Sequence, residues 1–389
     1  MVKGFVFAAI VASVAAGYAA SDVINVEGTG RDKLAVSIDV KGDEAYANSL
    51  RRNLERSGMF KIAKTGKVRV VGTVGESVRA ELLENGKLRT LSLSSTAGDS
   101  KEARTEARRM ADAICEKFVG QAGFASDPIA FVRRTGKGVS ELCVGYADGY
   151  DIRQLAKDNA SVVGPRWKDG KTLFYTGIYE SGPQIYEFDT LASRRHLKWA
   201  FKGLTTGAVV SPDGGRVAII LSLHGQPDLY VINIASSTWM RLTNTKASEG
   251  QPSWSPDGKQ IVYVSNEARK PQLYVIDVAT KAKRRLTSVG SQNVDPDWGP
   301  DGRIAYITKR AGGAQIAIMD PAKGDKGAVL VGEPGTWEHP SWSRNHRHLI
   351  ASRDKALYIV DTLAAEDGGD KPRRLFESDG VWITPCWRR

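Results

Sequence analysis

The stretch Pro252-Ser-Trp254-Ser-Pro-Asp-Gly258 decides the fold of this 389-residue chain, because the chain repeats it. Related stretches are Gly164-Pro-Arg-Trp167, Val209-Val210-Ser-Pro-Asp-Gly214, Pro296-Asp-Trp298-Gly-Pro-Asp-Gly302, Pro340-Ser-Trp342 and Pro385-Cys-Trp387. The tryptophan-equivalent positions are 167, 210, 254, 298, 342 and 387, so successive positions differ by 43, 44, 44, 44 and 45 residues. A fixed period of this length indicates a repeat architecture.

Each repeat contains the segments of a four-stranded sheet. After the Pro-Asp-Gly turn at 256–258 come an apolar run at 260–265, a second run at 272–277 and a short basic segment at 283–287. With the Pro-x-Trp segment these make four strands. The runs are apolar at successive residues, so both faces of each small sheet should be covered. A four-stranded unit of this length is a propeller blade.

The first and last repeats are each incomplete, and each supplies what the other lacks. Strands are expected at 129–133, 141–146 and 151–155 without a Pro-x-Trp strand before them, whereas the segment at 385–387 has no strands after it. We therefore predict that the C-terminal strand completes blade one and closes a six-bladed β-propeller over residues 128–389, leaving no open edge there. Cys143 and Cys386 would then lie two strands apart, roughly 9.6 Å, which predicts that they stay unpaired.

Residues 22–127 predict a small α/β domain ahead of the propeller. Strands are expected at 33–39, 68–74, 78–83 and 87–93, the last two joined by an Asn85-Gly86 turn. One helix should start at Asp43 and stop at Gly58, and a second should run from Asp99 to about Val119. Residues 120–127 are the expected linker.

The first 21 residues have the order of a secretory signal peptide. Lys3 is followed by an apolar stretch at 5–16 and then by small residues up to Ser21. An uncleaved N-terminal anchor is the alternative. The signal-peptide interpretation predicts that the mature chain is soluble outside the cytoplasm, in the periplasm.

The positive charge does not indicate nucleic-acid binding. The chain has 55 Lys and Arg against 44 Asp and Glu, a net charge of +11. Residues 1–127 contribute 19 − 16 = +3 and residues 128–389 contribute 36 − 28 = +8, with acids interspersed throughout. Phosphate binding needs clustered cations. Acidic protein surfaces or the anionic cell envelope are the expected partners of this mild excess.

The turns that lead into the inner strands carry the candidate binding residues. Six such turns should converge on one mouth of the central channel, where short polar groups can be directed jointly at one protruding loop of a partner. The alternative is that they only solvate a water-filled channel. The partner-binding candidates are Glu249, Gln251, Gln292, Asn293, Asp295, Glu338 and His339.

No catalytic, cofactor or metal site is expected. The chain has no Gly-x-Ser-x-Gly nucleophile motif, which argues against a hydrolase of the prolyl-oligopeptidase kind. Asp295, Glu338 and His339 could imitate the metal site of a lactonase-like propeller, but the same groups suit a protein-binding mouth. A metal-dependent hydrolase is therefore kept as the less favoured alternative.

The arrangement resembles the TolB family, the exported propeller component of the Tol-Pal cell-envelope system. The resemblance rests on the Trp-Ser-Pro-Asp-Gly repeats, Tyr146-Ala-Asp-Gly-Tyr150, Gln272-Leu-Tyr-Val-Ile-Asp277, Arg285-Leu-Thr287 with Ser291-Gln-Asn293, and 50–60 before the propeller. It implies a non-catalytic periplasmic scaffold that helps constrict the outer membrane during division. The implied partners are a Pal-like peptidoglycan-associated lipoprotein at the propeller and a Tol inner-membrane protein at the N-terminal region.

This sequence departs from the family pattern in two ways. Its N-terminal domain looks shorter than is usual, and residues 21–30 do not clearly match the family's tail motif. A propeller of the same shape that serves another envelope complex, or that binds glycan, is the alternative function.

Overall fold

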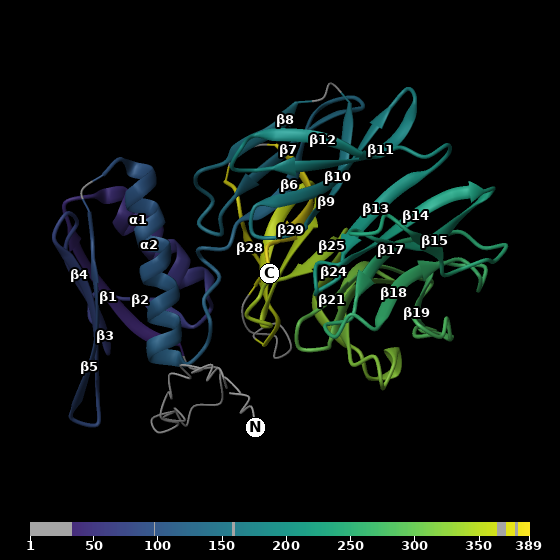
Figure 1. Ribbon diagram of the computed structural model, residues 1–389. Coiled ribbons are helices and arrows are strands. Elements are labelled where there is room, and N and C mark those ends of the chain that lie inside the picture. The colour runs from purple at the N-terminus through teal and green to yellow at the C-terminus, as the bar shows by residue number, and fades with distance from the viewer. Residues whose placement is uncertain (1–32, 97, 158–159, 364–370, 378–379) are drawn as a thin grey trace, which may run out of the picture.

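The computed structural model describes residues 33–389 except 97, 158–159, 364–370 and 378–379. The predicted signal peptide at 1–21 lies outside the described residues. Figure 1 shows an α/β part beside a propeller of small sheets arranged around an axis. The predicted fold class, mainly β with a small α/β domain before six four-stranded blades, is confirmed.

The N-terminal part is one five-stranded sheet covered by two helices. The strands have the order β2-β1-β3-β4-β5, with β1 parallel to both of its neighbours and β3, β4 and β5 antiparallel. The elements are β1 (Leu34–Lys41), α1 (Glu44–Arg56), β2 (Phe60–Ile62), β3 (Val68–Thr73), β4 (Ser77–Glu84), β5 (Lys87–Ser94) and α2 (Ser100–Ile114), which continues as a π-helical turn at Cys115–Val119. Only β2 was not expected from the sequence.

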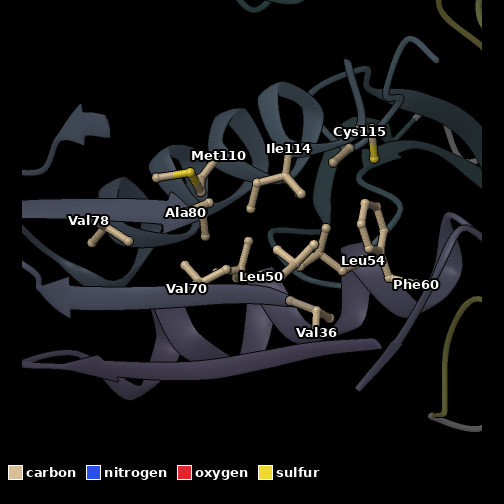
Figure 2. Packing of buried hydrophobic residues seen from close by; sticks show 14 of the residues in the cluster. Val36, Leu50, Leu54, Phe60, Val70, Val78, Ala80, Met110, Ile114 and Cys115 are labelled. Atoms are coloured by element: carbon tan, nitrogen blue, oxygen red, sulfur yellow. The ribbon is translucent and has the colours of Figure 1, made fainter. Parts of the chain in front are cut away.

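Local sequence signals set these elements. The Asp43 carboxylate caps α1 by accepting a hydrogen bond from the Tyr46 N–H, and Asp99 caps α2 in the same way. Asn85 and Gly86 both have positive φ, as the tight turn between β4 and β5 requires. Figure 2 shows the core between sheet and helices, where side chains from all these layers meet, among them Val70, Leu50 and Met110.

The described residues of the propeller form six sheets of four strands each. From the axis outward, blade one is β29 (Val381–Trp387), β6 (Ile129–Gly136), β7 (Val139–Gly145) and β8 (Arg153–Lys157); blade two is β9 (Ser161–Trp167), β10 (Thr172–Tyr179), β11 (Gly182–Asp189) and β12 (Arg194–Trp199); blade three is β13 (Thr205–Val210), β14 (Arg216–His224), β15 (Gln226–Asn233) and β16 (Trp239–Arg241). Blade four is β17 (Glu249–Trp254), β18 (Gln260–Ser265), β19 (Gln272–Asp277) and β20 (Lys283–Arg285); blade five is β21 (Gln292–Trp298), β22 (Ile304–Arg310), β23 (Gly313–Met319) and β24 (Val329–Gly335); blade six is β25 (Glu338–Trp342), β26 (His348–Arg353), β27 (Ala356–Asp361) and β28 (Arg373–Arg374). A 3₁₀ turn at Asp325–Gly327 precedes β24.

The ring closes as predicted. The C-terminal strand β29 pairs antiparallel with β6, so the two ends of the propeller sequence share blade one. Cys386 lies opposite Ala130, and Cys143 lies opposite Phe131 on the next strand. Both cysteines are buried and free, which confirms that they do not pair.

The two ends of the propeller differ. We call the end where the inner strands begin the top face, and the end where they finish at the tryptophan-equivalent positions the bottom face. Neighbouring strands within each blade are antiparallel, so turns from the first to the second strand and from the third to the fourth lie at the bottom face. The N-terminal part packs against such turns: the Gln121 side chain bonds the Asn345 carbonyl, and Arg108 bonds Asp148.

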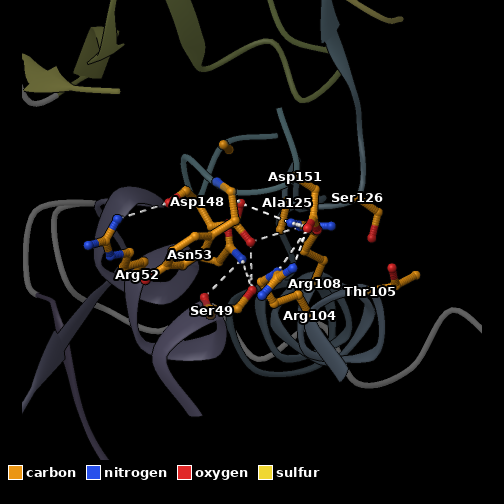
Figure 3. A network of polar contacts seen from close by, with 12 residues as sticks. Ser49, Arg52, Asn53, Arg104, Thr105, Arg108, Ala125, Ser126, Asp148 and Asp151 are labelled. Carbon is orange, nitrogen blue, oxygen red and sulfur yellow. Dashed lines mark hydrogen bonds and ion pairs between the residues drawn. The ribbon is translucent and has the colours of Figure 1, made fainter. Parts of the chain in front are cut away.

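A buried polar network joins the two parts at the bottom face (Figure 3). Asp148, from the turn between β7 and β8, accepts from Arg108 Nε at 2.8 Å and from Ser49 Oγ at 2.6 Å. Arg108 also reaches Asp151 at 2.6 Å, and Arg104 pairs with the same carboxylate. Both helices of the N-terminal part thereby hold one loop of blade one, so these contacts of the described N-terminal residues lie at the bottom face.

No helix within the described ranges is both long enough and apolar enough to cross a membrane.

Candidate partner-binding mouth of the propeller

One backbone feature recurs in every inner strand. The residue three positions before the tryptophan-equivalent has a positive φ, between +47° and +69°, and the pairing register with the second strand shifts there. Each inner strand therefore carries a bulge around the axis. We call the six positions the bulge ring: Gly164, Gly207, Gln251, Asp295, His339 and Thr384.

Four members of the bulge ring are not glycine. A positive φ is uncommon for a residue with a Cβ, and it costs on the order of 1–3 kcal/mol at each position. Such strain persists only where the surrounding structure enforces it. The ring is therefore a candidate functional feature as well as a structural one.

Hydrogen bonds between blades enforce the ring in blades four, five and six. Gln251 Oε1 accepts from the Asp295 N–H at 3.0 Å, and Gln251 Nε2 donates to the Asp295 carboxylate. Asp295 Oδ2 then accepts from the His339 N–H at 3.0 Å. Each side chain thus satisfies the bulged backbone of the next blade.

Asp295 and His339 form an ion pair at this mouth. Asp295 Oδ1 lies 3.2 Å from His339 Nδ1, with 8% of the Asp295 side chain and 29% of the His339 side chain exposed. Burial disfavours the charged form of both groups, but their mutual attraction outweighs it. The pKa of Asp295 therefore lies below its ordinary value, and the pKa of His339 lies above its own.

The structure separates the seven candidate residues into two groups. Gln251, Gln292 and Glu338 are exposed at the top face, and Asp295 and His339 join Gln251 in the bulge ring.

The other two candidates lie behind this surface. Glu249 is buried, its Oε1 accepts from Thr245 Oγ1 at 2.9 Å, and burial raises its pKa. Asn293 is also buried, and its Nδ2 donates to Gln272 Oε1 and to the Val289 carbonyl, both at 2.8 Å. Glu249 and Asn293 are placed to hold the mouth in shape, while contact with a partner by any of the seven stays a prediction.

Sequence reasoning missed three members of the bulge ring: Gly164, Gly207 and Thr384. Their signal was the constant offset of three residues before each tryptophan-equivalent position, followed by proline in five of the six blades. A Cβ added to Gly164 would meet no atom within 4 Å, so the ring is open on the side of blade two. The mouth is therefore asymmetric, with its polar side chains gathered over blades four to six.

The acidic residues and histidines of the mouth do not form a metal centre. Across the described residues, no group of three or more His, Cys, Asp or Glu side chains is placed to hold a metal ion. Asp295 and His339 come together, and Glu338 does not join them as a third ligand.

The fold and this mouth define a class of protein: closed six-bladed propellers that present polar groups around one end of the axis and bear a separate α/β part at the other. The chain belongs to the TolB β-propeller family, because the model of the TolB beta propeller domain matches residues 115–389. The family suggested by the sequence is confirmed.

Known relatives agree with this assignment. The Tol-Pal system protein TolB of Anaeromyxobacter dehalogenans strain 2CP-C is 31% identical over 162 residues, and that of strain 2CP-1 is 32% identical over the same length. Each alignment covers 40% of this chain and 36% of the relative, so the match spans about a third of the length of these relatives.

Solved structures share the fold. TolB from Acinetobacter baumannii superposes with a TM-score of 0.80 at 22% identity, covering 92% of this chain and 96% of that one. A putative TolB from Agrobacterium tumefaciens gives a TM-score of 0.51 at 20% identity, covering 65% of this chain and 90% of that one. The Acinetobacter match includes the α/β part as well as the propeller.

Proposed function

We propose that this protein is a non-catalytic periplasmic scaffold of the Tol-Pal system. In this proposal the top mouth of the propeller binds a Pal-like peptidoglycan-associated lipoprotein, and the N-terminal region contacts a Tol inner-membrane protein. The protein would then link inner membrane, peptidoglycan and outer membrane and support envelope integrity during cell division. Family membership supports the system, and the geometry of the mouth supports the binding surface.

The bulge ring is the observation that carries the binding surface. Its polar side chains are held in strained backbone conformations toward the end of the axis opposite the one that the described residues of the N-terminal part contact. Gln251, Gln292 and Glu338 expose donors and acceptors there, beside the Asp295–His339 pair. A rigid ring of this kind binds a protruding loop without first having to order its own side chains, which favours affinity.

A pull-down with a matched pair of variants tests the proposal. The mouth variant combines Gln251→Gly, His339→Gly and Glu338→Gln; glycine is chosen because blades two and three already have it at the equivalent positions and because it adopts positive φ freely. Asp295 stays unchanged because its carboxylate accepts from the His339 N–H and so holds the bulged backbone of blade six, a bond that glycine at 339 retains. The bait is the full chain, the source is envelope extract of the organism that encodes it, and the readout is a peptidoglycan-binding lipoprotein identified by mass spectrometry.

The control variant is Ser237→Gly with Lys281→Gly. Both residues also have positive φ and are exposed, but they lie in turns between third and fourth strands at the bottom face. We expect the native chain and the control to retain the lipoprotein and the mouth variant to bind it at least roughly tenfold more weakly. The proposal is wrong if the native chain retains no such lipoprotein, and the mouth is not the binding surface if its variant binds like the control.

A further inference from the structure

A cavity lies on the axis at the bottom face, at the end opposite the mouth described above. It has a volume of about 350 Å³ and is lined by the ends of the inner strands of blades one to five. Its walls are aromatic and its charged rim is mainly basic. The lining residues used below are Trp167, Trp254, Trp298, Arg166, Lys168 and Arg389.

Arg166 departs from a pattern that three other blades keep. The residue before the tryptophan-equivalent accepts a hydrogen bond from the next blade: Ser253 Oγ from the Trp298 N–H at 3.0 Å, Asp297 Oδ2 from the Trp342 N–H at 2.7 Å, and Ser341 Oγ from the Trp387 N–H at 3.1 Å. Arginine has donors only and cannot take this role. Blade two therefore places a cation in the channel where three other blades place an acceptor.

The other two cations of the cavity are neutralised. Lys168 Nζ lies 2.5 Å from Glu187, and Arg389 Nη2 lies 2.7 Å from Asp297. The Arg166 guanidinium, in contrast, makes one hydrogen bond to the described part of the chain, from Nη1 to the Pro165 carbonyl at 3.0 Å. Four of its five N–H donors thus remain for a ligand.

We propose that this cavity binds a small organic carboxylate, with the carboxylate on Arg166 and the carbon skeleton against the tryptophan walls. The planar guanidinium matches a carboxylate with two parallel hydrogen bonds. A volume of about 350 Å³, with mostly apolar walls and a single convergent cation, suits a ligand of small-molecule size. The site lies at the end opposite the proposed partner mouth and does not depend on that function.

Arg166 also connects the cavity electrostatically to the bulge ring. Its positive charge helps to lower the pKa of Asp295 and opposes protonation of His339, whereas Asp295 and Glu338 favour protonation of His339. A carboxylate bound to Arg166 would offset its charge. Occupancy of the bottom cavity should therefore raise the pKa of His339, and this gives a readout at a residue that the ligand does not touch.

The probe is 4-phenylbutyrate, and 4-phenylbutyramide is its neutral analogue. The full chain is titrated with each while the indole N–H signals of the tryptophans are followed by NMR, and the pKa of His339 is measured with and without the acid. Three variants are compared: Arg166→Gln, Arg166→Lys and the control Lys171→Gln, which changes an exposed lysine on the adjacent turn. The folded state of each is checked by its NMR spectrum.

We expect saturable binding of the acid to the native chain and to the control, and weaker binding of the amide. Arg166→Gln should bind the acid roughly 10- to 100-fold more weakly than the native chain, as for the loss of a hydrogen bond to a charged group. The affinity of Arg166→Lys for the acid should lie between those of the native chain and Arg166→Gln. The His339 pKa should rise with the acid in the native chain but not in Arg166→Gln. Equal binding of acid and amide, unchanged affinity in Arg166→Gln, or absence of saturable binding to the native chain would each overturn the proposal.

Discussion

Replacing Asp148 by asparagine should uncouple the two parts of the molecule. The Asp148 side chain is fully buried and accepts four hydrogen bonds: from Ser49 Oγ at 2.6 Å, from Arg108 Nε at 2.8 Å and Nη2 at 3.1 Å, and from the Tyr150 N–H at 3.0 Å. Asp148→Asn removes the charge and turns one acceptor into a donor that faces other donors. Arg108, which is 2% exposed, is left with the Asp151 carboxylate alone.

The expected cost follows from this geometry. Removing one partner of a buried ion pair typically costs 3–5 kcal/mol, because the other charge stays buried. Asp151 still neutralises part of the Arg108 charge, so we expect the lower end, about 3 kcal/mol. Since Ser49 lies on α1, Arg108 on α2 and Asp148 in blade one, the loss falls on the contact between the parts rather than on either core. Unfolding should then separate into two transitions.

Calorimetry of the full chain measures the loss of stability and the number of unfolding transitions, with limited proteolysis at the linker 120–127 as a second readout. The matched control is Lys283→Gln, which breaks the exposed pair with Glu267 and should cost less than about 1 kcal/mol. The double variant Arg108→Met with Asp148→Leu should recover much of the loss, since it leaves no buried charge of this pair. An Asp148→Asn protein that unfolds in one transition, with the stability of the control, would refute the reasoning.

Two further predictions concern buried titratable groups. Burial lowers the pKa of His348 from 6.5 to about 4, so the unfolded chain binds a proton at this side chain first as pH falls. Neutral His348 therefore contributes on the order of 3 kcal/mol to the free energy of unfolding above pH 6.5, and this contribution is lost toward pH 4. Denaturant melts of the native chain and of His348→Gln from pH 7 to pH 4 test this prediction. Asp127, with a pKa raised to about 6, shifts stability in the opposite direction, but it is present in both proteins and cancels in the difference between their free energies of unfolding. A difference that stays constant over this pH range would contradict the prediction. Burial raises the pKa of the Cys115 thiol to about 12 and that of Cys143 to about 11, so neither should react with iodoacetamide at pH 8 in the folded chain. After unfolding without reductant all three cysteines should react, and two blocked thiols would show a disulfide.

The architecture could be predicted because its signals are local and repeated. The 43- to 45-residue period and the Pro-Asp-Gly turns give the blade, and the unmatched segments at the two ends give the pairing of β29 with β6. β2 was missed for the opposite reason. It is three residues long and is held by parallel pairing with β1, a partner on the far side of α1 in the sequence, so the sequence around it carries no strand period.

The mouth could be predicted only in part, because a bulge changes which residues share a face. Glu249 and Gln251 are two residues apart, as are Asn293 and Asp295, so in a regular strand each pair would point the same way. The register shift at Gln251 and at Asp295 interrupts that alternation. One member of each pair is therefore buried against the neighbouring blade, while the other lies in the bulge ring.

The bulge ring itself runs against a sequence rule, and the closed ring explains why. A residue before proline normally takes an extended backbone with negative φ, yet Gln251, Asp295 and His339 each precede proline with φ near +50°. Their hydrogen bonds cross from blade to blade, so they form only once the blades are packed around the axis. Tertiary closure, rather than local preference, thus sets the backbone at this mouth. Glycine in blades two and three has the same positive φ without a side chain. The polar groups of Gln251 and Asp295 add the hydrogen bonds that join blades four, five and six.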